Sequence, residues 1–253
     1  MRLTGKTALI TGGGSGFGEG IAWRFAEEGA RVLVVDVNGD GAHRVAEEIN
    51  ATYQGAARAH TADITQALDV NGVVKAALDF YEHLDIVVNN AGVTHRNMPM
   101  LDVPEEEFDR IYEVNVKALY LMAKAAVPVM QAEEQGGVFL NIASTAGVRP
   151  RPGLTWYNGS KGAAIVLTKS MAVELAPFKI RVCAINPVAG ETPLLEKFMG
   201  EDTPEKREAF QATIPLGRFS RPLDIANAAV FLCSDEAEFL TGVCLEVDGG
   251  RCV

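Results

Sequence analysis

Short apolar runs alternate with longer amphipathic stretches along the whole chain. Seven of the runs have the length and composition of buried strands: Thr7–Thr11, Val32–Asp36, Ala57–Ala62, Ile86–Asn90, Val138–Ala143, Arg181–Asn186 and Cys244–Val247. Helical periodicity marks stretches between them, among them Ala42–Asn50, Ala67–Tyr81, Glu105–Met130, Thr155–Ala176 and Pro222–Cys233. Strands that alternate with helices of this length predict a parallel sheet with right-handed crossovers. We therefore expect an α/β fold with one doubly wound sheet of about seven strands and helices on both faces.

The segment from Pro187 to Phe219 departs from this alternation. It contains four prolines, mixed charges and little periodicity. Ligands of open α/β sheets bind beyond the carboxyl ends of the strands, and this segment starts at such an end. We interpret residues 188–219 as a mobile lid over a substrate, with a surface excursion of no function as the alternative. No repeat or linker divides the chain, so residues 1–253 are expected to form a single domain.

Composition and charge exclude several classes of protein. The chain has 253 residues, is 48% hydrophobic and carries a formal net charge of −10, which argues against binding of nucleic acid. No apolar run approaches the ~20 residues of a membrane-spanning helix, and the N-terminus leaves no room for a signal peptide before Gly12. The four cysteines and four histidines lack metal-ligand spacing, so we predict no metal site. These features favour a reducing, cytoplasmic setting.

A glycine-rich turn follows the first predicted strand. Gly12, Gly16 and Gly18 lie in the run G-G-G-S-G-F-G, and a helical pattern begins at once. Such a strand, turn and helix N-terminus can bind a pyrophosphate, because glycines let the backbone approach closely and the helix end offers free N–H groups. The spacing is not the common G-x-G-x-x-G, so the turn alone is also consistent with a flexible loop.

Asp36 ends the second predicted strand, 18 residues after Gly18. An acid at about this distance accepts hydrogen bonds from the ribose hydroxyls of NAD and repels the 2′-phosphate of NADP. Gly13, Gly14, Ser15 and Val37 supply no cation for that phosphate. We therefore predict NAD as the cofactor; the alternative is an acid that is only solvated at a strand end.

Ser144, Tyr157 and Lys161 predict a site for proton transfer. Tyr157 and Lys161 are four residues apart in a predicted helix, which places both side chains on one face. A lysine ammonium close to a phenol favours the phenolate, so we expect the pKa of Tyr157 to lie below its usual value of about 10. Ser144 arrives from a strand end and can hold the oxygen of a carbonyl or an alcohol. Taken singly, Ser144 could equally begin a loop and Tyr157 could be a packed aromatic.

Together these residues resemble the short-chain dehydrogenase/reductase family in its single-domain branch. The resemblance rests on T-G-G-G-S-G-F-G (Thr11–Gly18), N-N-A-G (Asn89–Gly92), Asn115, Ser144, Y-N-G-S-K (Tyr157–Lys161) and V-D-G-G (Val247–Gly250). It implies a Rossmann-type fold and a single dinucleotide-binding and catalytic domain. It also implies an NAD-dependent enzyme acting on a CH–OH group, which interconverts a secondary alcohol and a ketone with Tyr157 as the acid or base.

The resemblance implies a role for each matching residue. The implied catalytic residues are Asn115, Ser144, Tyr157 and Lys161, with Asn115 perturbing its helix and holding a water that joins Lys161 to solvent. The implied cofactor contacts are Gly12, Ser15, Gly16, Phe17, Gly18, Asp36, Val37, Asp63, Ile64, Asn90, Ala91, Gly92, Tyr157, Lys161, Pro187, Val188 and Thr192. Outside the resemblance, Asp63 could equally be a helix N-cap.

The chain departs from the family pattern at two positions. Val188 stands where the family usually has glycine in P-G-x-x-x-T, which puts the backbone shape beside the nicotinamide in doubt. Phe17 replaces an aliphatic residue. Substrate selectivity is expected from the lid and from Thr94, His95, Arg96, Arg149, Arg151 and Trp156. Three of these residues are arginines expected near the opening of the substrate site, which hints at an anionic substrate. Arginines in loops are, however, commonly only solvated.

Other functions remain open at this level. A 3-oxoacyl-thioester reductase is one alternative, and Asp36 argues against it because biosynthetic reductases usually use NADPH. A non-catalytic dinucleotide-binding sensor is another, and the intact set of Ser144, Tyr157, Lys161 and Asn115 argues against it. A serine hydrolase is poorly supported, because no G-x-S-x-G is present. The family resemblance implies a homotetramer. The stretch Glu105–Met130 is apolar on more than one face, which an interface with another subunit would explain. The tail from Arg251 to Val253 could reach a neighbouring subunit.

Overall fold

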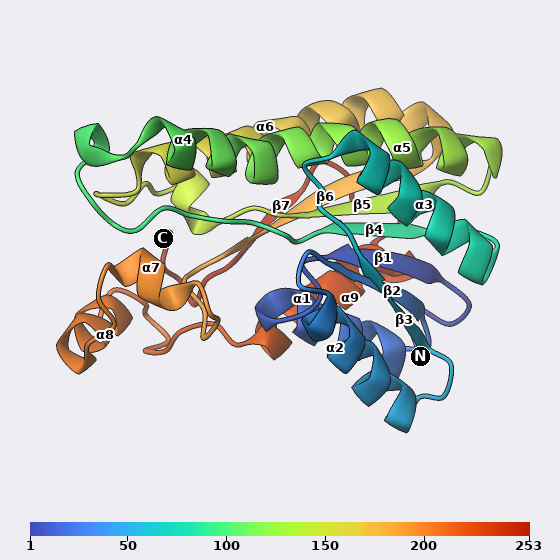
Figure 1. Cartoon of the computed structure of the whole chain (residues 1–253), viewed down its shortest axis with the longest axis horizontal. Coiled ribbons are helices and arrows are strands. Elements are labelled where there is room, and N and C mark those ends of the chain that lie inside the picture. The colour runs from blue at the N-terminus through green and yellow to red at the C-terminus, as the bar shows by residue number, and fades with distance from the viewer.

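One parallel sheet runs through the computed structural model, which describes residues 1–253 (Figure 1). Its strands lie in the order β3-β2-β1-β4-β5-β6-β7, and every neighbouring pair is parallel. Their bounds are β1 Thr7–Thr11, β2 Arg31–Asp36, β3 Ala57–Thr61, β4 Ile86–Asn89, β5 Gly137–Ile142, β6 Ile180–Pro187 and β7 Cys244–Val247. All seven predicted strands are confirmed, with ends that differ by no more than one residue.

Helices cover both faces of this sheet. One face carries α1 (Gly16–Glu27), α2 (Gly39–Thr52) and α9 (Pro222–Cys233). The other carries α3 (Ala67–Tyr81), α4 (Glu105–Tyr112), α5 (Ala118–Ala132) and α6 (Thr155–Leu175) (Figure 1). The predicted doubly wound, Rossmann-type α/β fold is therefore confirmed. None of the helices is long and apolar enough to cross a membrane.

The strands are apolar on both faces because each face packs against helices. Alternate residues enter two separate cores, as the period of two along a strand requires. The core beneath α1, α2 and α9 contains Ile10, Val34, Val88, Leu140 and Cys183. The core beneath α3, α5 and α6 contains their neighbours Leu9, Leu33, Val87, Phe139 and Val182. The sheet is thus a rigid platform that fixes the positions of the strand ends.

The chain changes direction across the sheet between β1 and β4. From β1 it proceeds to β2 and β3 on one side, and from β4 it proceeds to β5, β6 and β7 on the other. The loops that follow β1 and β4 therefore separate at their carboxyl ends, and such a switch point leaves a crevice where ligands bind. The glycine-rich turn and the segment Asn89–Gly92 follow these two strands.

The predicted helix over Glu105–Met130 is interrupted at Asn115. This corrects the continuous helix that the periodicity indicated, and it agrees with the perturbation at Asn115 that the family resemblance implied. A π-helical turn over Glu113–Lys117 separates α4 from α5. Asn115 at its centre is buried and turns its amide away from the helix, toward the backbone of Val93 and the hydroxyl of Ser160. The extra residue in the turn accommodates this side chain, as π-bulges at functional sites commonly do.

The 188–219 segment folds into a small layer beside the strand ends. It contains two short helices, α7 (Leu195–Met199) and α8 (Pro204–Gln211), which its weak periodicity did not predict. Its own apolar cluster consists of Val188, Leu195, Phe210, Ile214 and Phe219. In Figure 1 these helices form the left end of the molecule, and the C-terminus lies beside α7.

Candidate active site

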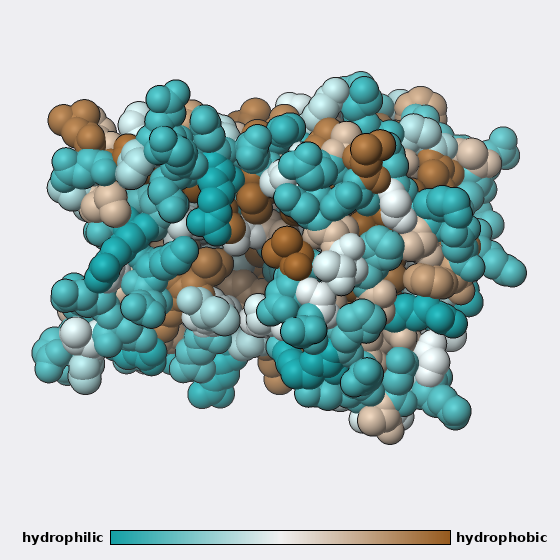
Figure 2. Space-filling model, in the orientation of Figure 1, coloured by the Kyte–Doolittle hydropathy of each residue, from teal (hydrophilic) through white to brown (hydrophobic).

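A cavity of about 580 Å³ lies at the carboxyl ends of the strands. Its walls come from the turn after β1, the segment after β4, the end of β5, the N-terminal part of α6, the 188–219 segment and the C-terminal tail. Figure 2 shows the hollow on this face, with hydrophobic residues at its floor, between the regions that Figure 1 labels α4 and α7. Residues that are distant in sequence therefore meet in one site.

The glycine turn is packed so closely that side chains cannot enter it. A Cβ atom on Gly18 would lie 2.1 Å from the carbonyl oxygen of Gly12, and one on Gly12 would lie 2.8 Å from the Cα of Ala91. Gly12 and Gly16 have φ values of +61° and +58°, a conformation that favours glycine. This bare backbone at the N-terminus of α1 is the cradle that a pyrophosphate requires. The residues present therefore fit a dinucleotide.

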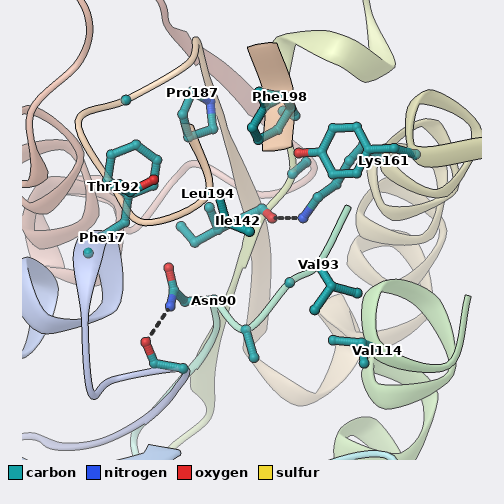
Figure 3. Close-up of a pocket in the computed structure, with 18 of the residues that line it drawn as sticks. Phe17, Asn90, Val93, Val114, Ile142, Lys161, Pro187, Thr192, Leu194 and Phe198 are labelled. Atoms are coloured by element: carbon teal, nitrogen blue, oxygen red, sulfur yellow. Dashed lines mark hydrogen bonds between the residues drawn. The ribbon is translucent and has the colours of Figure 1, made fainter. Parts of the chain in front are cut away.

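Asn90 holds this turn from the neighbouring strand end. Its Nδ2 donates to the carbonyl oxygens of Thr11 and Gly12 at 2.9 and 3.0 Å (Figure 3). The Thr11 hydroxyl in turn accepts the backbone N–H groups of Asn90 and Ala91, each at 3.1 Å. The two successive asparagines at the end of β4 thus have a structural explanation, because the buried Asn89 also donates to Asn141 Oδ1 at 2.9 Å.

Two acids lie at the end of the cavity that contains the glycine turn. Asp36 accepts the N–H of Gly14 at 2.9 Å and that of Asn38 at 2.9 Å, which fixes its carboxylate at the end of β2. Asp63 accepts both the N–H and the hydroxyl of Thr65, at 3.0 and 2.8 Å, and it is not the N-cap of α3, which is Gln66. Val37 and Ile64 line the cavity beside them.

Tyr157, Lys161 and Ser144 meet at the other end of the cavity. All three side chains are buried and line it. Lys161 Nζ donates to the carbonyl of Ile142 at 2.8 Å and lies 5.9 Å from the centre of the Tyr157 ring (Figure 3). Ser144 follows β5, and its hydroxyl accepts the N–H of Ala146 at 3.0 Å. Tyr157 and Lys161, on one face of α6, therefore share a space with the Ser144 hydroxyl from the end of β5.

The pKa of Tyr157 differs from our prediction. Burial raises it to about 12, although hydrogen bonding to Ser144 and the charge of Arg151 act in the opposite direction. Burial also lowers the pKa of Lys161 to about 8. In the ligand-free protein, desolvation therefore outweighs the hydrogen bond to Ser144 and the charge of Arg151, and the phenol is protonated at neutral pH.

Asn115 connects the segment after β4 to α6. Its Oδ1 accepts the N–H of Val93 at 2.9 Å, and its Nδ2 donates to the Val93 carbonyl at 2.9 Å and the Ser160 hydroxyl at 2.9 Å. A Cβ on Gly92 would lie 3.2 Å from Lys161 Nζ and 3.4 Å from Asn115 Oδ1. Gly92 therefore leaves the space in which the ammonium and the amide face each other.

The two departures from the family pattern have local explanations. Val188 is buried in the apolar cluster of the 188–219 segment, and its backbone φ is not positive, so a valine is accommodated there without strain. The Phe17 ring occupies the space beside Gly190, where a Cβ would approach it to 2.3 Å. Thr192 packs against Gly16, and Pro187, Val188 and Thr192 all line the cavity.

Four of the six expected substrate residues do not line the cavity. Thr94 and His95 are buried, and their side chains bind the backbone carbonyls of His95 and Arg96. Arg96 donates to the Gly200 carbonyl at 2.7 Å. The Trp156 indole donates to the Met100 carbonyl at 3.2 Å and packs edge-on against Phe108. These four residues hold loops, which corrects the expectation, whereas Arg149 and Arg151 do line the cavity.

Several lining residues were not predicted from the sequence. Phe198 points into the pocket from α7 and packs edge-on against Tyr157, with ring centres 5.0 Å apart (Figure 3). Phe210 of α8 and Arg251 of the C-terminal tail also line it. Only the D-G-G before Arg251 could have signalled that the tail turns back toward its own chain.

Comparison with known proteins decides the family. A family model described as enoyl-(acyl carrier protein) reductase matches residues 12–251. The 4-formylbenzenesulfonate dehydrogenase of Comamonas testosteroni is 54% identical over 252 residues, which are 99% of this chain and 99% of that protein. This chain belongs to the short-chain dehydrogenase/reductase family. The resemblance inferred from the motifs is thereby confirmed, and the protein is an enzyme of this family.

Solved structures of other short-chain dehydrogenases/reductases superpose on this one along its whole length. The crystal structure of a 3-ketoacyl-(acyl-carrier-protein) reductase from Brucella melitensis complexed with NADH is 52% identical, with a TM-score of 0.93 over 99% of this chain and 100% of that one. The crystal structure of levodione reductase is 29% identical, with a TM-score of 0.95 over 99% of both chains. The fold is therefore kept among relatives whose names refer to different substrates.

Proposed function

We propose that this short-chain dehydrogenase/reductase is an NAD(H)-dependent oxidoreductase that interconverts a secondary alcohol and a ketone. One observation carries the proposal: the glycine cradle and the buried set of Ser144, Tyr157 and Lys161 line the same cavity. The cradle would hold a dinucleotide, which supplies or accepts the hydride when bound. The side chains of the protein then have only to bind the substrate oxygen and to move its proton.

Each of these side chains has a defined part in this proposal. Ser144 orients the substrate oxygen, and Tyr157 transfers a proton between its hydroxyl and that oxygen. In the ligand-free protein Tyr157 is protonated, which is the form that donates to the oxygen of a ketone. Lys161 binds the nicotinamide ribose and passes protons onward, and Asn115 holds the backbone around it. The buried site keeps these groups preoriented and excludes bulk water.

The choice of NAD over NADP rests on charges at the ribose end. The Asp36 carboxylate lines the cavity there, and a 2′-phosphate would face it. Arg44 lies nearby and donates to the Gly14 carbonyl at 3.1 Å, but it pairs with Glu19 and Glu48 at 2.9 and 3.0 Å. It does not line the cavity, so no unpaired cation faces a 2′-phosphate. The NADH complex of the Brucella melitensis relative supports the same choice.

The remaining cofactor contacts are proposed from their position on the cavity. They are Gly12, Ser15, Gly16, Phe17, Val37, Asp63, Ile64, Asn90, Ala91, Gly92, Pro187, Val188 and Thr192. Gly18 belongs with them because it lets the turn close on Gly12. Residues 188–219 are proposed as the lid, because Thr192, Leu194, Phe198 and Phe210 line the cavity from that segment.

A 3-oxoacyl thioester is the second candidate substrate. The name of the Brucella melitensis relative favours it, whereas the Comamonas testosteroni relative is named for an aromatic aldehyde with a sulfonate. Two outcomes distinguish these functions in one experiment. We would follow the absorbance of the reduced cofactor with a panel of alcohols, aldehydes, ketones and acetoacetyl thioesters, each with NAD(H) and NADP(H). A higher kcat/KM with NADP(H), or turnover of thioesters alone, would contradict the primary proposal.

We also propose a homotetramer in the cytoplasm. Exposed apolar side chains on α5 and α6 support the assembly, with Tyr120, Val166 and Val173 more than half exposed. Burial against another subunit would remove this surface from water. The four cysteines are free thiols, which is consistent with a reducing compartment. Light scattering after size exclusion would give the mass of the assembly, and a monomer would contradict the first part.

A further inference from the structure

Three arginines surround the substrate end of the cavity without a carboxylate partner. Six of the other eleven arginines pair with acids: Arg2, Arg24, Arg44, Arg110, Arg207 and Arg218. The remaining five do not, but they do not line the cavity: Arg31, Arg58, Arg96, Arg181 and Arg221. Arg149, Arg151 and Arg251 form no such pair, although all three line the cavity. In a chain with a net charge of −10, this concentration of unpaired positive charge in one place requires an explanation.

Arg151 and Arg251 are the inner members of this group. The Nη1 atom of each is buried and has no hydrogen-bond partner. Both guanidinium groups lie over the Phe210 ring, at 4.1 and 5.9 Å from its centre. Stacking on this ring restrains the two groups but satisfies none of their N–H donors. A buried guanidinium donor without an acceptor costs free energy, so the pair is built for a ligand that brings oxygen atoms.

The tail that carries Arg251 is held in place by specific contacts. The Asp248 carboxylate accepts the N–H groups of Gly250 and Cys252 at 2.9 and 2.7 Å. The Gly249 backbone packs on the 188–219 segment, where Leu216 N–H donates to its carbonyl at 3.1 Å. Arg149 donates to the carbonyl of Arg251. Arg149 is therefore a positioning residue for the tail, and Arg251 belongs to the cavity of its own chain.

The surroundings of the pair define what kind of ligand it would bind. Phe198 and Leu194 supply apolar walls beside Tyr157. The acids Asp36 and Asp63 line the opposite, glycine end of the cavity, so a ligand charge at the arginines does not face them. The third lining acid, Glu113, is paired with Lys117 at 3.5 Å. Arg151 also lies near enough to Tyr157 to lower the pKa of the phenol, which places the pair beside the reacting group.

We propose that Arg151 and Arg251 bind an anionic oxygen group, a sulfonate or a carboxylate, on the substrate, while its apolar body packs against Phe198 and Leu194. This inference rests on the proposed function and names its substrate class: carbonyl compounds and alcohols that carry such an anion. Burial and the charge of Arg251 lower the pKa of Arg151 to about 10, and an anion between the two groups relieves both effects.

The test separates binding from turnover. Calorimetric titration would measure the Kd of benzenesulfonate, with the neutral methyl phenyl sulfone as a ligand of similar size. We expect benzenesulfonate to bind, and its Kd to rise about ten- to hundredfold in Arg251→Gln, the range of one lost hydrogen bond to a charged group. Arg251→Lys should recover part of the loss. Arg207→Gln is the control, because it removes the same charge from the exposed α8 surface.

Kinetics with a matched pair of ketones would show whether the anion matters for turnover. We expect 4-acetylbenzenesulfonate to have the higher kcat/KM, and Arg251→Gln to raise its KM while leaving 4-methylsulfonylacetophenone within about twofold. Arg151→Gln should affect both ketones, since Arg151 also acts on Tyr157.

The outcomes distinguish this inference from the proposed function. Equal binding of benzenesulfonate to wild type and to both glutamine variants would overturn the inference. Equal loss in Arg207→Gln would do the same. Turnover of 4-acetylbenzenesulfonate with unchanged kinetics in both glutamine variants would overturn the inference and retain the function. Binding that depends on the arginines, with no turnover of any alcohol or carbonyl compound, would retain the anion site and overturn the function.

Discussion

The two ends of the cavity are built differently. At the glycine end (Gly12–Gly18 and Asn90) backbone atoms fill the available space. At the arginine end (Arg149, Arg151 and Arg251) charged side chains lie without carboxylate partners. The glycine end is closed by hydrogen bonds between neighbouring strand ends, such as those from Asn90 to Thr11 and Gly12. The arginine end is assembled from the loop before α6, the 188–219 segment and the tail. The first end is complete in the free protein, and the second has unsatisfied donors.

This difference indicates how one fold serves different substrates. A cradle for a dinucleotide can serve enzymes with different substrates, and here it is built on the rigid sheet. A substrate site differs between enzymes, and it is built here from segments at the edge of the fold. Four substitutions test whether the two ends act as separately as this comparison requires.

The largest expected effect is the loss of chemistry without loss of cofactor binding. In Tyr157→Phe we expect kcat to fall by about 10²–10⁴, because the proton donor is removed from a site that is otherwise unchanged. The Kd of NADH, measured by fluorescence titration, should stay within about twofold. A variant with near-normal kcat would show that Tyr157 is not the acid.

In Gly18→Ala we expect cofactor binding to weaken while ligand binding at the arginine end is kept. The new Cβ would lie 2.1 Å from the Gly12 carbonyl oxygen, so the turn has to open. We expect the Kd of NADH to rise at least about tenfold, while benzenesulfonate still binds at the arginine end. Gly72→Ala is the matched control, because a Cβ there meets no atom within 4 Å. Coupled loss of both ligands at an unchanged melting temperature would contradict the separation.

Lys161 is buried beside Tyr157, and its charge is expected to reduce stability. Burial lowers its pKa to about 8 from its usual value of 10.5, so between these pH values the unfolded chain holds a proton that the folded chain lacks. The free energy of unfolding therefore rises with pH across this window, and the cost of the buried charge is fully present below pH 8. We expect Lys161→Met to be more stable than wild type by about 1–3 kcal/mol at pH 7.

Chemical denaturation of the ligand-free protein at several pH values would check this expectation. The difference between Lys161→Met and wild type should shrink between pH 8 and pH 10. A constant difference across that range would mean that the ammonium is not destabilised by burial. The variant should also lose activity, since stability and function oppose each other at such a position.

The smallest expected effect is a change in cofactor choice. In Asp36→Asn the carboxylate that faces the ribose becomes neutral, and we expect the ratio of kcat/KM for NAD over NADP to fall about tenfold. The KM of the ketone should not change, because Asp36 lies at the glycine end. An unchanged ratio would show that discrimination lies elsewhere, and an altered ketone KM would show that the two ends are coupled.

The hydrophobic pattern predicted the sheet well because its strands are buried on both faces and end at clear breaks. The helix from Glu105 to Met130 was predicted less well, since its periodicity continues through the π turn at Asn115. The cause of that turn is a set of hydrogen bonds to Val93 and Ser160, and contacts so distant along the chain leave no local pattern.

At the candidate site, too, the sequence predicted what short spacing sets and missed what depends on contacts distant along the chain. Residues grouped by short spacing do line one cavity, as do Gly12 and Gly16 of the glycine turn and Tyr157 with Lys161 of α6. The expected substrate residues Thr94, His95, Arg96 and Trp156 lie near Tyr157 or Asn90 in sequence but bind loop carbonyls instead. Phe198, Phe210 and Arg251 were missed because their approach to Tyr157 depends on how the 188–219 segment and the tail pack.

By itself, the sequence determined the order of strands and helices, the glycine turn and the shared face of Tyr157 and Lys161. These features depend on contacts between residues that are close along the chain, where backbone geometry restricts the outcome. Only the tertiary structure decided that burial sets the pKa of Tyr157 and that Arg251 joins Arg151 over Phe210. Desolvation and the meeting of distant charges depend on everything that packs around a group, so they exist only in the folded chain.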